Sequence, residues 1–125
     1  MSDWYFPFNW DVNEVWGLEG KIEGRNIKDF KWHLEKPFWS SVRGKGMMFD
    51  LKPREVIEKP EKHIYHSARV EDADVSYPVC LTTYKGREII IDGIHRLAKL
   101  VSENIETIEV KVINEKSIAD IARYT

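Results

Sequence analysis

An apolar strand that turns directly into an amphipathic helix, within residues 88–101, constrains this sequence more than any other feature. Residues 89–91 are three consecutive isoleucines, as is typical of a strand buried on both faces. The pair Asp92 and Gly93 follows, and apolar residues then recur with helical spacing at positions 94, 97, 98 and 101. A strand joined this closely to a helix predicts an α/β domain with a mixed sheet.

The segments before this stretch predict one strand and two helices. Phe30, Trp32 and Leu34 alternate with polar residues, which predicts a half-buried strand over residues 28–35. Pro53 and Pro60 each suit the first turn of a short helix.

A hairpin, a strand and a last helix complete the predicted fold. Residues 78–83 and 88–91 form the hairpin around a Lys85-Gly86 turn, and its apolar second strand is expected to be central. Residues 108–112 alternate as a further strand. Ser117, with Asp120 three residues later, resembles a capping box that opens the helix.

The beginning of the chain is rich in aromatic residues, since all five tryptophans fall within the first 39 positions. A chain of 125 residues supports one hydrophobic core rather than two. We therefore expect residues 1–26 to be an aromatic-rich N-terminal extension packed on the core, and residues 27–125 to be the single α/β domain. If the aromatic residues are exposed, they mark an interface with a partner protein.

The charge balance disfavours two classes of partner. The 19 Lys and Arg against 21 Asp and Glu give a net charge of -2, so no bulk attraction to nucleic acid or to an anionic membrane is expected. The single Cys80 suits a reducing compartment, and no apolar run is long enough to span a bilayer. We therefore expect a cytoplasmic protein.

The strand-to-helix turn has the outline of a phosphate site. The first turn of a helix presents unpaired N–H groups at the positive end of the helix dipole, which here start at Gly93 and Ile94. His95, Arg96 and Lys99 follow within a turn and a half, so phosphate contacts are expected from all five residues.

Asp92 has two interpretations. His95 could donate a further hydrogen bond to the phosphate or transfer a proton, and Asp92 could hold a hydrated magnesium ion beside the phosphate. It could equally be a helix cap, with His95 and Arg96 paired to surface carboxylates.

The run Ile-Asp-Gly-Ile-His-Arg at residues 91–96, with Ile-Glu-Val-Lys-Val at 108–112, resembles the ParB N-terminal and sulfiredoxin superfamily. The resemblance covers residues 27–113 and is sharp only from residue 88. It implies a ParB/sulfiredoxin-like fold that binds a nucleotide (ATP, ADP or CTP) with Mg²⁺ at this turn.

Departures from each branch of the superfamily narrow the expected activity. Ile94 stands where sulfiredoxins carry their reactive cysteine, and no helix-turn-helix pattern follows residue 113, so neither sulfiredoxin chemistry nor chromosome partition is expected. The Asp-Gly-x-His-Arg form is most similar to the ADP-dependent free serine kinases, which implies a kinase or a nucleotide hydrolase with an unidentified small-molecule acceptor.

A kinase needs a carboxylate that accepts the proton of the acceptor hydroxyl. Glu35 is ranked first because it follows the first predicted strand, and Glu55 second. His33 is a further candidate, although a lone histidine is more often structural. His63 and His66 are spaced to bind one metal but lack a convincing third ligand.

The predicted helix that carries His63 and His66 has another interpretation, in which His66 and Arg69 face the nucleotide.

Two further functions are kept as alternatives. A DNA-binding protein or nuclease would need Arg43 and Lys45 to join Arg96 and Lys99 in one basic surface. A noncatalytic interaction module, with a second copy of the chain as one possible partner, would use the N-terminal tryptophans.

Overall fold

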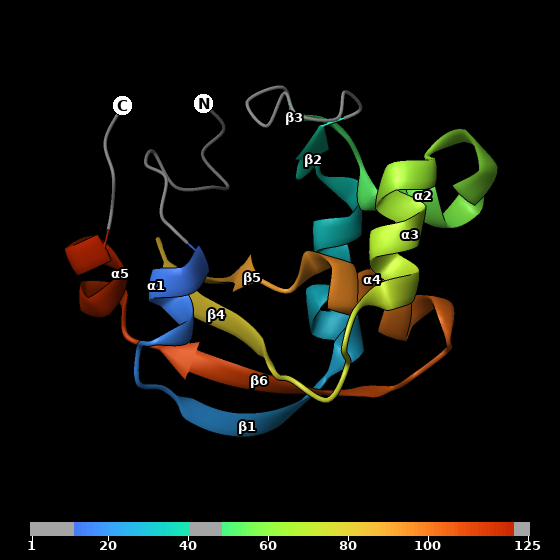
Figure 1. Cartoon of the computed structure of the whole chain (residues 1–125). Coiled ribbons are helices and arrows are strands. Elements are labelled where there is room, and N and C mark those ends of the chain that lie inside the picture. Colours follow the sequence, from blue (N-terminus) through green and yellow to red (C-terminus); the bar gives the residue numbers. More distant parts are fainter. Residues whose placement is uncertain (1–11, 41–48, 122–125) are drawn as a thin grey trace.

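The computed structural model describes residues 12–40 and 49–121 of the chain (Figure 1). Trp4 and Trp10 of the aromatic-rich extension lie outside these residues, as do Arg43 and Lys45 of the predicted basic surface. The described residues form an α/β domain, as predicted.

The elements follow one another in a mixed order along the chain. The helices are α1 (Val12–Trp16), the 3-10 helix η1 (Ile27–Glu35), α2 (Pro53–Glu58), the 3-10 turn η2 (Pro60–Lys62), α3 (Ile64–Asp72), α4 (Ile94–Ser102) and α5 (Glu115–Ile121). The strands are β1 (Lys21–Asn26), β2 (Trp39–Ser40), β3 (Phe49–Leu51), β4 (Val79–Tyr84), β5 (Arg87–Asp92) and β6 (Thr107–Ile113).

Four strands form the main sheet in the order β1-β6-β4-β5. β4 runs parallel to β6, while β1 and β5 are antiparallel to their neighbours. The predicted hairpin is confirmed: Lys85 and Gly86 between β4 and β5 both have positive φ, 52° and 77°, as a tight two-residue turn requires. β2 and β3 form a separate antiparallel pair.

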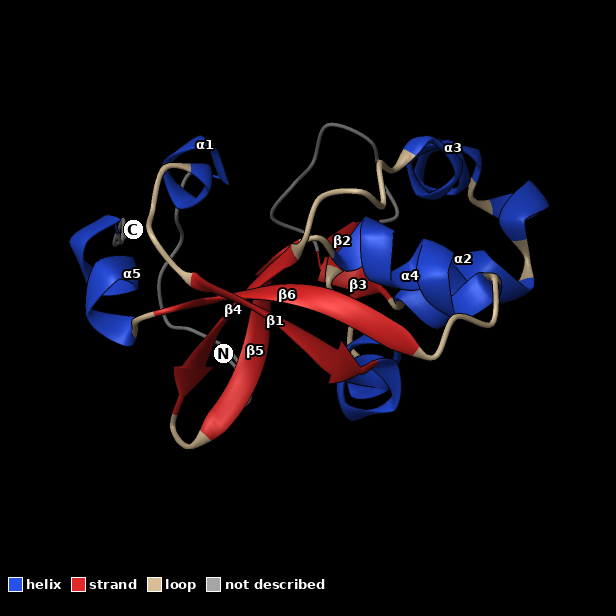
Figure 2. Ribbon diagram, turned by 90° about the horizontal axis from the view of Figure 1, so that it is seen from below, coloured by secondary structure: helices blue, strands red, loops and turns tan. Residues whose placement is uncertain are grey.

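Helices cover both faces of the main sheet (Figures 1 and 2). Phe30 of η1, Val56 of α2 and Leu97 of α4 pack with Ile90 on one face. Val15 of α1 and Ile118 of α5 pack on the other face, with Ile89 and Ile91. The three isoleucines thus alternate between two cores.

The strand predicted over residues 28–35 is wrong, because this segment is the 3-10 helix η1. Ile27, Phe30 and His33 lie three apart and are all buried, which is the repeat of a 3-10 helix. The Asn26 side chain accepts a hydrogen bond from the Lys28 N–H at 3.1 Å and starts the helix.

The expectation that the apolar strand is central is also wrong, since β5 lies at the edge of the sheet. At its outer edge the fully buried His33 of η1 accepts the Ile90 N–H through Nε2 at 3.0 Å. Nδ1 of the same ring donates to the Phe30 carbonyl at 2.8 Å. Burial lowers the pKa of His33 to about 4, which keeps the ring neutral and able to accept.

Both ends of the domain differ in detail from the predicted boundaries. Residues 21–26, assigned above to the extension, form edge strand β1. The last helix begins at Glu115, two residues before the predicted capping box, because the Asn114 side chain accepts the Lys116 N–H at 2.8 Å. Within residues 12–40 and 49–121, no helix is long and apolar enough to cross a membrane.

Candidate functional site

The turn between β5 and α4 is built on Gly93. This residue has φ 111° and ψ 22°, in the left-handed region that favours glycine. A side chain here would also crowd the neighbouring strand β4, because a Cβ would lie 3.1 Å from Val79 Cγ2 and 3.3 Å from Val79 Cα. Because glycine occupies this position, α4 begins at Ile94 with only Gly93 between it and the end of β5. The N–H groups of the first turn have no partner within the helix.

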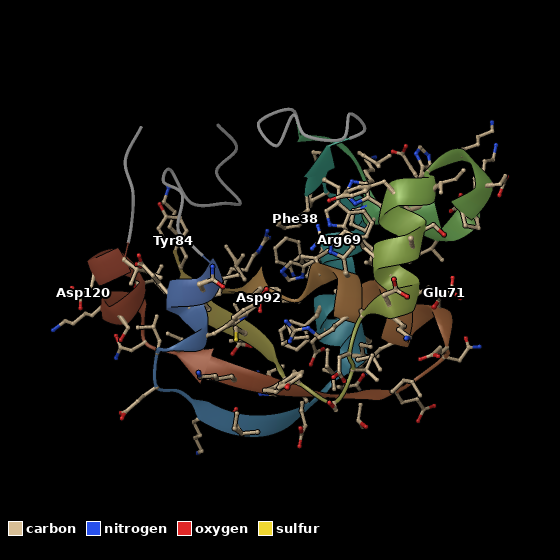
Figure 3. The ribbon with its side chains drawn as sticks, viewed as in Figure 1. Phe38, Arg69, Glu71, Tyr84, Asp92 and Asp120 are labelled. Atoms are coloured by element: carbon tan, nitrogen blue, oxygen red, sulfur yellow. The ribbon has the colours of Figure 1, made fainter. Side chains whose placement is uncertain are left out.

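Asp92 and Arg96 form an ion pair across this turn. Asp92 Oδ2 accepts from Arg96 Nη2 at 2.7 Å and from the indole Nε1–H of Trp16 at 2.7 Å. Arg96 also donates to the carbonyl of Pro78. The two charged side chains are only 13% and 15% exposed, and Asp92 lies between α1 and α4 (Figure 3). Arg96 is thus engaged in holding the turn to the start of β4.

Lys99, the third predicted phosphate contact on α4, is also engaged within the domain. Its ammonium donates to the carbonyls of Glu71 at 2.6 Å and Ala73 at 3.2 Å. These carbonyls lie at the end of α3, where a cation satisfies groups that the helix leaves unpaired. Lys99 therefore ties α4 to α3.

His95 lies in a stacked aromatic cluster on the other side of the turn. Its ring is 4.2 Å from that of Trp39 with an interplanar angle of 13°, and the ring of His66 is 4.7 Å from the same indole at 5°. His66 Nδ1 and His95 Nε2 are 3.2 Å apart and share a hydrogen bond. The two imidazoles therefore lie edge to edge against Trp39.

Burial lowers the pKa of His95 to about 3, and the charges of Arg69 and His66 act in the same direction. The ring is consequently neutral near pH 7. Arg69 is exposed on the side of α3 that faces the start of α4 (Figure 3). The structure thus brings His66 and Arg69 to the turn, as the second interpretation of their helix required.

The predicted bases lie elsewhere. The exposed carboxylate of Glu35 accepts from Arg54 Nε at 2.7 Å, and no contact links it to Asp92 or Arg96 in the part of the chain that the structure describes. Glu55 lies in the first turn of α2. His33 is structural, because both of its ring nitrogens bond to backbone groups.

The two predicted metal sites, His63 with His66 and Asp92, differ in the number of protein ligands that they need. Among residues 12–40 and 49–121 no group of three His, Cys, Asp or Glu side chains could hold a metal, so His63 and His66 gain no third ligand. Magnesium needs fewer protein ligands, because it keeps several waters and takes one or two carboxylates plus substrate phosphates. Asp92 fits this role through Oδ1, because both hydrogen bonds that it accepts end on Oδ2.

A cavity of about 290 Å³ lies at the other end of α4, among α2, α3 and α4. Val56, Ile57 and Val70 form its apolar wall, and Glu71 and Glu103 lie at its polar side. It is separate from the β5–α4 turn.

Sequence reasoning missed two residues of the site, Trp16 and Trp39. Each contacts a residue of the β5–α4 region from far away in the chain, Trp16 through Asp92 and Trp39 through His95. The only signal was the concentration of tryptophan before residue 40.

Comparisons with known proteins give no relative: no family model, no curated protein and no solved structure matches the chain. The candidate site therefore rests on its own geometry.

Proposed function

We propose that this chain is a nucleotide-binding domain that holds phosphate at the first turn of α4 and supports magnesium-dependent phosphoryl transfer or nucleotide hydrolysis. The observation that carries the proposal is the left-handed Gly93, which joins the end of β5 directly to the start of a nine-residue helix. This arrangement aims backbone N–H groups and the positive end of the helix dipole at one point, where an anion is stabilised.

The residues around the turn have distinct roles in this proposal. The backbones of Gly93, Ile94 and His95 bind the phosphate, and Arg69 supplies positive charge from α3. Arg96 is a positioning residue, because its guanidinium holds Asp92 and the turn. Asp92 would hold the magnesium ion, which neutralises charge on the phosphoryl group when bound.

His95 is not assigned the proton-transfer role. A base is most effective when its pKa lies near the working pH, and a pKa of about 3 places His95 far below it. Glu35 has an exposed carboxylate, but it is paired with Arg54 and makes no contact with the turn among the described residues, so it is not assigned this role either. The molecule that accepts the phosphoryl group would be a small molecule.

The structure offers little support for a nucleic-acid surface. Arg96 and Lys99 donate to groups within the domain, and Arg43 and Lys45 lie outside the described residues. We place the protein in the cytoplasm, since its one cysteine, Cys80, is a buried free thiol, which suits a reducing compartment.

Calorimetric titration with ATP, ADP and CTP, with and without Mg²⁺, tests the proposal. Arg69→Ala should weaken nucleotide binding about tenfold, as expected for loss of one charged contact to phosphate. Arg87→Ala is the matched control, because it removes the same side chain from the opposite end of β5. Absence of saturable binding by the unmodified protein, or equal loss in both variants, contradicts the proposal.

A further inference from the structure

Trp16 is an exposed aromatic ring held in one orientation. The residue is 58% exposed at the end of α1, although α1 itself is anchored in the core by the fully buried Val15. The indole N–H donates to Asp92 Oδ2 at 2.7 Å, and a hydrogen bond to a carboxylate is stronger than one between neutral groups. The ring is therefore pre-organised before any ligand arrives.

Among the described residues, Trp16 makes its polar contacts with charged side chains. Asp92 and Arg96 form their ion pair at the edge of the indole, and Lys111 Nζ lies 3.5 Å from the Trp16 carbonyl. Large contiguous apolar patches mark protein-binding surfaces. One rigid aromatic face among charges is better suited to a small, flat, polar ligand.

The position of Trp16 relates it to the phosphate turn. Its partner Asp92 immediately precedes Gly93, so the indole lies within the length of one side chain of the turn. A nucleotide carries its planar base a short distance from its phosphates, and bases of every kind stack on aromatic rings.

We propose that Trp16 is the stacking platform for the base of the nucleotide whose phosphates lie at the first turn of α4. This inference rests on the proposed function and adds to it the means of distinguishing a nucleotide from inorganic phosphate. The hydrogen bond to Asp92 then couples the base platform to the carboxylate proposed to hold magnesium.

The experiment compares ATP with inorganic tripolyphosphate, both with Mg²⁺, by calorimetry on the unmodified chain, Trp16→Ala and Trp16→Phe. Both variants lose the hydrogen bond to Asp92, so stacking on one aromatic ring predicts that Trp16→Ala binds ATP about tenfold more weakly than Trp16→Phe, while the two variants bind tripolyphosphate equally. Trp16→Phe keeps a stacking face but loses the N–H, so it should retain most of the preference for ATP.

A fluorescence readout covers the case in which Trp16→Ala does not fold. ATP should quench tryptophan emission in the unmodified protein, and this quenching should be smaller in Trp16→Phe although ATP still binds, because Trp39 remains at the turn. Equal weakening of both ligands in Trp16→Ala, or unchanged quenching in Trp16→Phe, overturns the stacking role.

The two proposals fail in different ways. If the unmodified protein binds ATP and tripolyphosphate equally well, phosphate binding stands and base stacking is wrong. If it binds neither, the proposed function is wrong and the stacking role falls with it.

Discussion

Asp92 and His95 are three residues apart on the same turn, yet the structure holds them by opposite physical means. Asp92 forms an ion pair with Arg96 and is fixed further by the indole of Trp16. His95 is kept neutral by burial and is fixed by stacking on Trp39 and by a hydrogen bond to His66. One side of the turn is charged and the other is aromatic.

The difference shows how a short helix can be oriented from two directions at once. The charged side ties α4 to α1 and to the start of β4, while the aromatic side ties it to β2 and α3. The N–H groups proposed to bind phosphate lie between the two sides, so both determine where a phosphate would lie.

We expect the largest effect from replacing Gly93, the residue that joins the two sides of the turn. Gly93→Ala forces a side chain into the left-handed region and against Val79, which should cost about 3 kcal/mol of unfolding free energy. Denaturant unfolding measures the loss. Gly24→Ala is the matched control on β1, since a Cβ there meets nothing within 4 Å. Equal stability of the two variants would show that the turn is not strained.

A smaller effect is expected from breaking the charged side alone. Arg96→Ala leaves the Asp92 carboxylate without its partner while it is only 13% exposed, so unfolding free energy should fall by about 2 kcal/mol. The exposed ion pairs of Arg54 provide the comparison, and Arg54→Ala should cost less than about 1 kcal/mol. If Arg96→Ala is no more destabilising than Arg54→Ala in the same urea titration, the pair does not hold the turn.

We expect the smallest effect from the aromatic side of the turn, as a change in how the free energy of unfolding depends on pH. The folded pKa of His95 is about 3 against 6.5 for the free side chain, so the unfolded state binds more protons below about pH 6.5. Stability from the neutral ring is therefore complete above pH 6.5 and declines as the pH falls towards 3.

His95→Phe keeps a ring for Trp39 but removes this proton site. The stability lost between about pH 7 and pH 5 should be smaller in the variant by about 1 kcal/mol, since His95 is partly exposed and solvent screens part of the shift. His33 is common to both proteins and accounts for part of the remaining slope. Parallel stability curves for the two proteins would contradict the neutral state of His95.

Local sequence signals predicted the elements close to the turn. The Lys85-Gly86 hairpin and the apolar spacing of α4 depend on residues a few positions apart, and both are confirmed. The 3-10 helix η1 was missed because Phe30 and Leu34 fit a two-residue alternation, while the three-residue repeat through His33 requires knowing that a histidine is buried.

The candidate site could be predicted only in part, because its contacts join distant segments. Asp92, Gly93 and Arg96 were found from one motif, and the structure brings them together. The bond from Trp16 to Asp92 spans 76 positions and that from His66 to His95 spans 29. Nothing in the local pattern of a sequence specifies such pairs.

The hydrogen bond from Ile90 to His33 has a consequence for self-association. Three consecutive isoleucines on an edge strand are a template for strand pairing between molecules, which is a common route to aggregation. In the native domain the neutral imidazole of His33 accepts the Ile90 N–H, so this group of the edge strand is already bonded. The pKa of His33 is about 4, and in strong acid the protonated ring can no longer accept this bond. The same buried histidine thus withholds the Ile90 N–H of this edge strand from pairing with another molecule, and protonation of the ring in acid removes that protection.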